Sequence, residues 1–200
     1  MLVGTLAVGI GVLDAASAAA SATAKDRYAL GDSVMLGARN DLKGLGFAVV
    51  DATESRQAYS GPARLRQRGD KLPSNVVIHL GTNGTFPLSV CKAMVKVAGP
   101  DRRVFLVTVH APRSWAKGNN EVIRQCDEAF ADDRVHVIDW NGAVTTHPRW
   151  LYNDRIHLRP AGAKAFAELI DVTVDRAAAD AHSKAVSEAS GAGTARVMEQ

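Results

Sequence analysis

Three short motifs carry residue types that can catalyse acyl transfer. Ser33 lies in a Gly-Asp-Ser sequence, Asn83 lies in Gly-Thr-Asn-Gly, and Asp154 precedes His157 by three positions. A serine hydroxyl becomes a nucleophile when a histidine accepts its proton, and a carboxylate can fix the tautomer of that histidine. An asparagine amide can donate a hydrogen bond to the oxyanion that forms. Alone, each motif also fits a bland role: a helix cap, a turn, or a surface Asp–His contact.

A metal site is the other chemistry that an Asp–His pair could serve. Zinc would need a third protein ligand, and neither a His-Glu-x-x-His sequence nor paired cysteines supply one. The sequence therefore predicts a serine-based site with no metal and no organic cofactor.

Alternating strands and helices must position these motifs. The expected strands are short apolar runs at 28–30, 47–50, 76–80, 104–109 and 135–138. The expected helices lie at 35–42, 62–68, 88–97, 120–130 and 160–174. This alternation predicts a three-layer α/β/α sandwich around a five-stranded parallel sheet. Ligands bind beyond the carboxyl ends of such strands, where Ser33 and Asn83 are expected.

The amino-acid composition indicates the class of protein and the kinds of partner to expect. Two hundred residues with 46% apolar and 22% charged side chains suit one globular domain. Aromatic residues make up only 6%, and the basic residues are scattered although the net charge is +3, so we expect no nucleic-acid partner. The two cysteines exclude a disulfide-dense scaffold.

The two ends of the chain differ from its body. Residues 1–24 combine an apolar run with an Ala/Ser stretch that resembles a signal peptide, although no basic residue precedes Lys25. A misplaced start, the end of a membrane segment and a plain Ala-rich leader are the alternatives, and we expect export. The domain itself is expected at 25–176, and residues 177–200 are expected to form a flexible tail.

The order of the motifs resembles the SGNH (GDSL-type) hydrolase superfamily. The resemblance covers about 28–174 and is closer still to the extracytoplasmic SGNH domains of bacterial membrane acyltransferases, including peptidoglycan O-acetyltransferases. That closer resemblance is carried by 31–36, 50–52 with 55–57, 79–84 and 112–115. The Gly-x-Ser-x-Gly motif of ordinary α/β-hydrolases is absent from the sequence.

The resemblance implies a flavodoxin-like sandwich and a role for each motif. Ser33 would be the nucleophile, His157 the general base and Asp154 its orienting partner. The oxyanion hole would use the backbone N–H groups of Ser33 and Ser55 and the Asn83 side chain. The sequence departs from the family at Ser55 and at the residue after Asp154, two positions where glycine is frequent.

Several further residues are expected near substrate. His110 follows the fourth strand, and Trp115 could stack on a sugar or simply pack over the sheet end. The full set of candidate substrate contacts is Asp32, Arg56, Gln57, Gly81, Thr82, His110, Trp115 and Arg155. His79, in a buried strand, is expected to be a hydrogen-bonded structural residue.

Cys91 and Cys126 lie on the helices after the third and fourth strands, which are neighbours in a flavodoxin-like order. If the protein is exported, a disulfide between them is expected. The alternative is two buried free thiols.

The expected reaction is O-acetyl transfer to a cell-envelope glycan outside the cytoplasm, a preference that comes from the resemblance. The partners would be an acyl donor and a glycan or small ester. Related acyltransferases carry a membrane domain, so a separate membrane partner or a missing domain is implied. The alternatives are a secreted carboxylesterase or deacetylase and a non-catalytic glycan-binding module, against which the intact Ser33, Asp154 and His157 speak.

Overall fold

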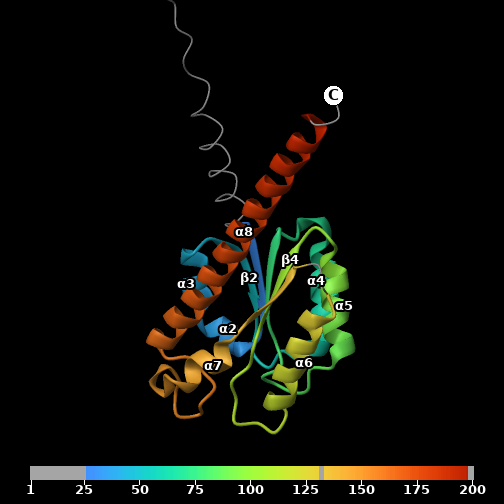
Figure 1. Cartoon of the computed structure of the whole chain (residues 1–200). Helices are drawn as coiled ribbons and strands as arrows, with labels where there is room; N and C mark the ends of the chain where they lie inside the picture. Colours follow the sequence, from blue (N-terminus) through green and yellow to red (C-terminus); the bar gives the residue numbers. More distant parts are fainter. Residues whose placement is uncertain (1–25, 131–132, 198–200) are drawn as a thin grey trace, which may run out of the picture.

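The protein folds around one parallel sheet of five strands in the order β2-β1-β3-β4-β5 (Figure 1). The computed structural model describes residues 26–130 and 133–197, so the expected leader at 1–24 lies outside the described residues. The strands are β1 Arg27–Gly31, β2 Phe47–Ala52, β3 Asn75–His79, β4 Arg103–Val107 and β5 Val135–Ile138. This is the flavodoxin-like order, and it confirms the α/β sandwich expected from the sequence.

Helices cover both faces of the sheet. On one face lie α2 Ser33–Gly37, α3 Arg39–Gly44, α7 Trp140–Thr145 and α8 Pro160–Val197. On the other face lie α4 Gly61–Arg68, α5 Leu88–Ala98 and α6 Ala116–Glu128. Short 3-10 turns occur at η1 Ala58–Ser60, η2 Gly69–Lys71 and η3 Pro148–Trp150. Figure 1 shows the two helical layers separated by the strands.

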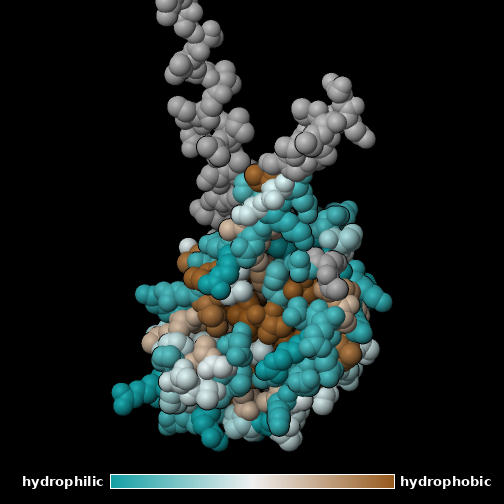
Figure 2. Space-filling view, viewed as in Figure 1, coloured by the Kyte–Doolittle hydropathy of each residue, from teal (hydrophilic) through white to brown (hydrophobic). Residues whose placement is uncertain are grey.

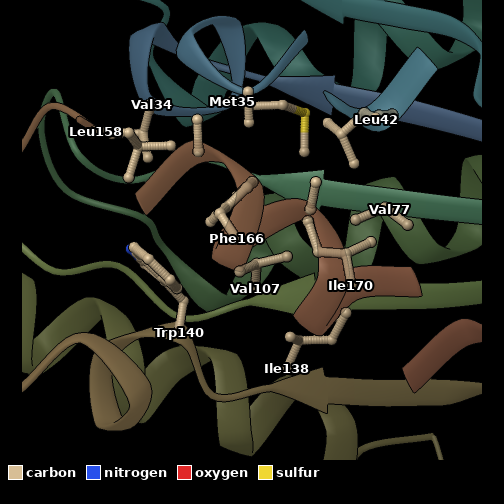
Figure 3. Close-up of a cluster of buried hydrophobic side chains, with 14 of the residues drawn as sticks. Val34, Met35, Leu42, Val77, Val107, Ile138, Trp140, Leu158, Phe166 and Ile170 are labelled. Carbon is tan, nitrogen blue, oxygen red and sulfur yellow. The ribbon is translucent and has the colours of Figure 1, made fainter. Parts of the chain in front are cut away.

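The strand sequences feed both cores because successive side chains point to opposite faces. Ala29 packs beneath α2 and α8, whereas Tyr28 and Leu30 pack beneath α4 and α5. In the first core, Phe166 of α8 is fully buried between the sheet and Trp140 (Figure 3). Burial on both faces explains why these strands read as continuous apolar runs.

The edge strand β5 is less well covered. Val137 and His136 are half-buried, and Figure 2 shows apolar surface in the middle of this view, between α8 and α6. The opposite edge of the sheet is β2.

Helix α8 is longer than the sequence suggested. The tail expected from residue 177 is helical through Val197, and Figure 1 shows α8 projecting past the sheet. Alanine has the highest helix propensity, so this Ala-rich stretch extends a helix already nucleated by packing. Two ion pairs from the buried Arg27 of β1, to Asp171 and Asp175, anchor the helix. Within 26–130 and 133–197, none of the helices has the length and apolar character needed to span a bilayer.

Candidate active site

The structure brings the serine, the histidine and the aspartate into one hydrogen-bonded chain. Ser33 begins α2 directly after β1, and Asp154 and His157 lie in the loop before α8. His157 Nε2 lies 3.0 Å from Ser33 Oγ, and His157 Nδ1 lies 2.6 Å from Asp154 Oδ2. Residues 124 positions apart therefore meet at the carboxyl end of the sheet.

The loop that carries the acid and the base is internally braced. Asp154 Oδ1 accepts hydrogen bonds from the Ile156 and His157 backbone N–H groups at 2.9 and 3.0 Å. Leu151 pairs with Leu158 across the loop, and both side chains are buried. The carboxylate is thus fixed by one oxygen and presents the other to the imidazole.

These contacts set the charge of Asp154. Partial desolvation raises the pKa of its carboxyl group. The hydrogen bonds from the His157 side chain and from two backbone N–H groups outweigh that effect, so the pKa is lowered below its usual value. Asp154 is therefore ionised at neutral pH and favours the His157 tautomer that carries its proton on Nδ1. That tautomer leaves Nε2 free to accept the proton of Ser33.

Candidate oxyanion donors lie on the neighbouring loops. Asn83 Nδ2 donates to the Arg56 carbonyl at 3.3 Å, which joins the loop after β3 to the loop after β2. An amide nitrogen has two protons, so Asn83 keeps a second donor. Among the described residues, the backbone N–H groups of Ser33 and Ser55 have no acceptor.

The two departures from the family pattern share one backbone conformation. Ser55 and Arg155 both have φ of 56°, in the left-handed region where glycine is favoured. Glycine is therefore the natural residue at both positions. Here each site carries a side chain instead, on the exposed surface.

Two of the expected substrate contacts have buried side chains that already have partners within the protein. Asp32 is fully buried, where it caps α2 by accepting from the Val34 N–H and faces His79 Nδ1 at 3.2 Å. Arg56 is also buried, and its guanidinium donates to the Gly31 carbonyl and pairs with Asp51. A side chain next to the nucleophile in sequence can point into the core when a helix starts there. The structure also confirms His79 as a hydrogen-bonded buried histidine.

The remaining candidates divide by exposure. Gly81 and Thr82 are buried and shape the loop after β3; Trp115 is half-buried and donates to the Thr82 carbonyl at 3.3 Å. His110 Nδ1 lies 3.0 Å from Asn141 Oδ1. Gln57 and Arg155 are exposed. Solvent-facing substrate contacts thus remain a proposal for Gln57 and Arg155.

Sequence reasoning missed a buried asparagine that holds the candidate oxyanion loop. Asn119 of α6 donates to the carbonyls of Gly81 and Gly84, both at 2.8 Å, and accepts from the Phe86 N–H. Gly81 has φ of 112°, and a Cβ there would lie 3.1 Å from Asn119 Nδ2. No local sequence pattern indicates this role, because the three bonds depend on tertiary contacts.

Cys91 and Cys126 form a disulfide, as expected, with Cα atoms 6.3 Å apart. It joins α5 to α6 on the face opposite α8. Across 26–130 and 133–197, no group of three or more His, Cys, Asp or Glu side chains is placed to hold a metal ion.

Sequence comparison finds relatives that are named as O-acetyltransferases. No family model matches the chain. YrhL of Bacillus subtilis, named as a candidate peptidoglycan O-acetyltransferase, is 32% identical over 151 residues, 74% of this chain and 23% of that protein. O-acetyltransferase OatA of Staphylococcus aureus is 33% identical over 150 residues, 73% of this chain and 24% of that protein. The chain thus spans about a quarter of the length of these relatives.

Solved structures share the fold. The C-terminal catalytic domain of Streptococcus pneumoniae peptidoglycan O-acetyltransferase A superposes with a TM-score of 0.67 at 23% identity, over 77% of this chain and 94% of that one. A Clostridium thermocellum family 3 carbohydrate esterase superposes with a TM-score of 0.61 at 15% identity, over 76% of this chain and 97% of that one. Together with the strand order, these likenesses identify the SGNH hydrolase fold.

Proposed function

The chain is an SGNH domain related to one segment of the peptidoglycan O-acetyltransferases, and we propose that it transfers an acetyl group through an acyl-enzyme on Ser33. The observation that carries this proposal is the continuous chain of hydrogen bonds from Ser33 Oγ through His157 to Asp154. Such a chain can move a proton away from the hydroxyl as that hydroxyl attacks a carbonyl.

The first half of the reaction forms the acyl-enzyme. Ser33 Oγ attacks the acyl carbon of the donor while its proton passes to His157 Nε2. The imidazolium that forms is stabilised by the carboxylate of Asp154. The oxyanion is bound by the N–H groups of Ser33 and Ser55 and by the second proton of Asn83 Nδ2. The intermediate collapses when the leaving group takes the proton from His157, which leaves an ester on Ser33.

The second half passes the acyl group to a glycan. A sugar hydroxyl gives its proton to His157 and attacks the ester carbonyl, and Ser33 recovers its proton as its bond to the acyl carbon breaks. The names of several relatives support peptidoglycan as the acceptor. Because the matched segment is only about a quarter of each relative, we assign the supply of the acyl donor to a membrane partner or a further domain. The disulfide supports an extracytoplasmic site, where thiols are oxidised.

Hydrolysis is the second candidate function. The side chains of His157 and Asp154 are 48% and 45% exposed, so water can reach the acyl-enzyme. The same residues would then activate water in place of a sugar hydroxyl. The chemistry differs only in which nucleophile resolves the ester.

Two assays test these proposals. Hydrolysis of p-nitrophenyl acetate should depend on Ser33, so the Ser33→Ala variant should lose it while the control Ser114→Ala, at an exposed loop serine, keeps it. With a chito-oligosaccharide added, mass spectrometry should detect acetylated sugar. Activity that survives in Ser33→Ala refutes the acyl-enzyme, and acetate as the sole product assigns the protein to hydrolysis.

A further inference from the structure

A cavity of about 480 Å³ opens on the loop that carries the acid and the base. Its charged lining consists of three arginines, Arg149, Arg155 and Arg159, all exposed. Pro148, Leu151, Tyr152 and Asn153 form the rest of the wall, and Asn153 is adjacent to Asp154 in sequence. The cavity therefore adjoins the catalytic loop itself.

The positive charge of this cavity is uncompensated. No carboxylate lines it, and among the described residues none of the three arginines has an ion-pair partner. The carboxylate of Asp154, which is adjacent in sequence to Arg155, is already bound to His157. The larger cavity under α8 differs, because three carboxylates, those of Asp133, Asp180 and Glu188, line it together with its basic residues.

The three guanidinium groups are held differently. Arg159 Nε donates to the Leu151 carbonyl at 2.8 Å, and its guanidinium lies 5.0 Å from the centre of the Tyr152 ring. Arg149 and Arg155 make no side-chain hydrogen bond to the described residues. One cation is thus fixed in the wall and two are available to a ligand.

The connection to the triad is direct. The Tyr152 N–H donates to the carbonyl of His157 at 2.9 Å, so the cavity wall and the general base share one turn of backbone. Arg155 lies between Asp154 and His157 in sequence. Its backbone has the left-handed conformation, which is strained for arginine and which glycine would adopt without strain.

We propose that Arg149, Arg155 and Arg159 form an anion subsite that binds a carboxylate or phosphate group of the acceptor glycan beside the triad. The subsite rests on the proposed acyl transfer and narrows its acceptor to a glycan that carries negative charge. Guanidinium groups suit both anions because their paired N–H donors match the geometry of two oxygens. A carboxylate on a sugar or attached peptide and a phosphodiester polymer are the two sources of this chemistry.

Binding to the unreactive Ser33→Ala protein tests the subsite by calorimetry. Three ligands of equal length are compared: a neutral chito-oligosaccharide, its carboxymethyl derivative and its phosphorylated derivative. We expect the anionic ligands to bind about 10-fold tighter at low salt, which is about 1.4 kcal/mol, and to lose that preference at 1 M salt. A preference for one anion identifies the source.

Charge-removing variants then locate the effect. Arg149→Gln combined with Arg155→Asn should abolish the preference, and asparagine tolerates the backbone at position 155. The control Arg66→Gln removes the same kind of charge from the exposed face of α4 and should keep the preference. Equal binding of neutral and anionic ligands overturns the subsite, as does a preference that survives in the double variant. The binding assay needs no turnover, so its result is independent of the transfer assay. If the Ser33→Ala protein shows the arginine-dependent preference but the wild-type protein transfers no acetyl group, only the proposed function is overturned.

Discussion

Replacing Asp154 with asparagine separates the orientation of His157 from all other contributions to catalysis. In the structure, one carboxylate oxygen accepts from two backbone N–H groups and the other accepts from His157 Nδ1. Asparagine keeps the backbone bonds only if its oxygen replaces Oδ1, which places its NH₂ group against Nδ1. Nδ1 must then accept a hydrogen bond, the imidazole proton moves to Nε2, and His157 can no longer take the proton of Ser33.

The expected loss is large and specific. A wrong histidine tautomer lowers kcat about 10⁴-fold in a serine triad, which corresponds to about 5.4 kcal/mol of barrier. The assay is the rate of acetylation of Ser33 by p-nitrophenyl acetate, followed as the burst of nitrophenol. The melting temperature should stay unchanged, because the loop keeps its backbone hydrogen bonds. The control Asp139→Asn changes an exposed capping aspartate of α7 and should leave the rate unaffected. A loss below about 10-fold in Asp154→Asn would refute the tautomer argument.

Three further perturbations have defined outcomes. Asn83→Ala should slow turnover about 100- to 1000-fold with the fold intact, because one oxyanion donor is lost; near-normal kcat would remove Asn83 from the hole. Replacing Cys91 and Cys126 by serine removes a covalent cross-link between residues 35 positions apart, so the unfolded chain gains entropy. Urea titration should show a free energy of unfolding lower by about 3–4 kcal/mol, and an unchanged midpoint would contradict this. Burial raises the pKa of Asp51, but its bonds to Arg56, Arg64 and Tyr28 outweigh burial and lower the pKa below 3.8. Its stabilisation is therefore full above about pH 4 and lost as the pH falls through the folded-state pKa, so Asp51→Asn should cost about 2–4 kcal/mol at pH 7 and less at pH 3.

The contact of Ser33, His157 and Asp154 could be predicted from the sequence because topology does most of the positioning. Once strands and helices alternate, the carboxyl ends of parallel strands share one edge, and Ser33 and Asn83 each follow a strand. The Asp-x-x-His spacing adds a local constraint, since three positions suffice for Asp154 to reach both the backbone and the ring of His157. The motif order and the alternation pattern therefore carried the architecture and the triad together.

Strand and helix alternation does not predict where the side chains of Asp32 and Arg56 point or how long α8 is. Asp32 and Arg56 lie in the right loops but point inward, because capping α2 and binding the strand-end carbonyls require buried partners. Residues 177–197 have no apolar period, so a tail was expected, yet their alanine content propagates the helix that Phe166 and Ile170 pack into place. The hydrogen bonds of the Asn119 side-chain amide depend on tertiary contacts, which no local sequence pattern predicts.

The Cys91–Cys126 disulfide between α5 and α6 makes the site sensitive to the redox state of its surroundings. Cys126 lies two turns beyond Asn119 on α6, and Asn119 is the residue that fastens the segment bearing Asn83. The covalent tie to α5 therefore limits how far that segment can drift. Thiol-reducing surroundings would release this restraint on the segment that bears Asn83, in addition to lowering the stability of the fold, while the contact of Ser33 with His157 lies outside the two bridged helices.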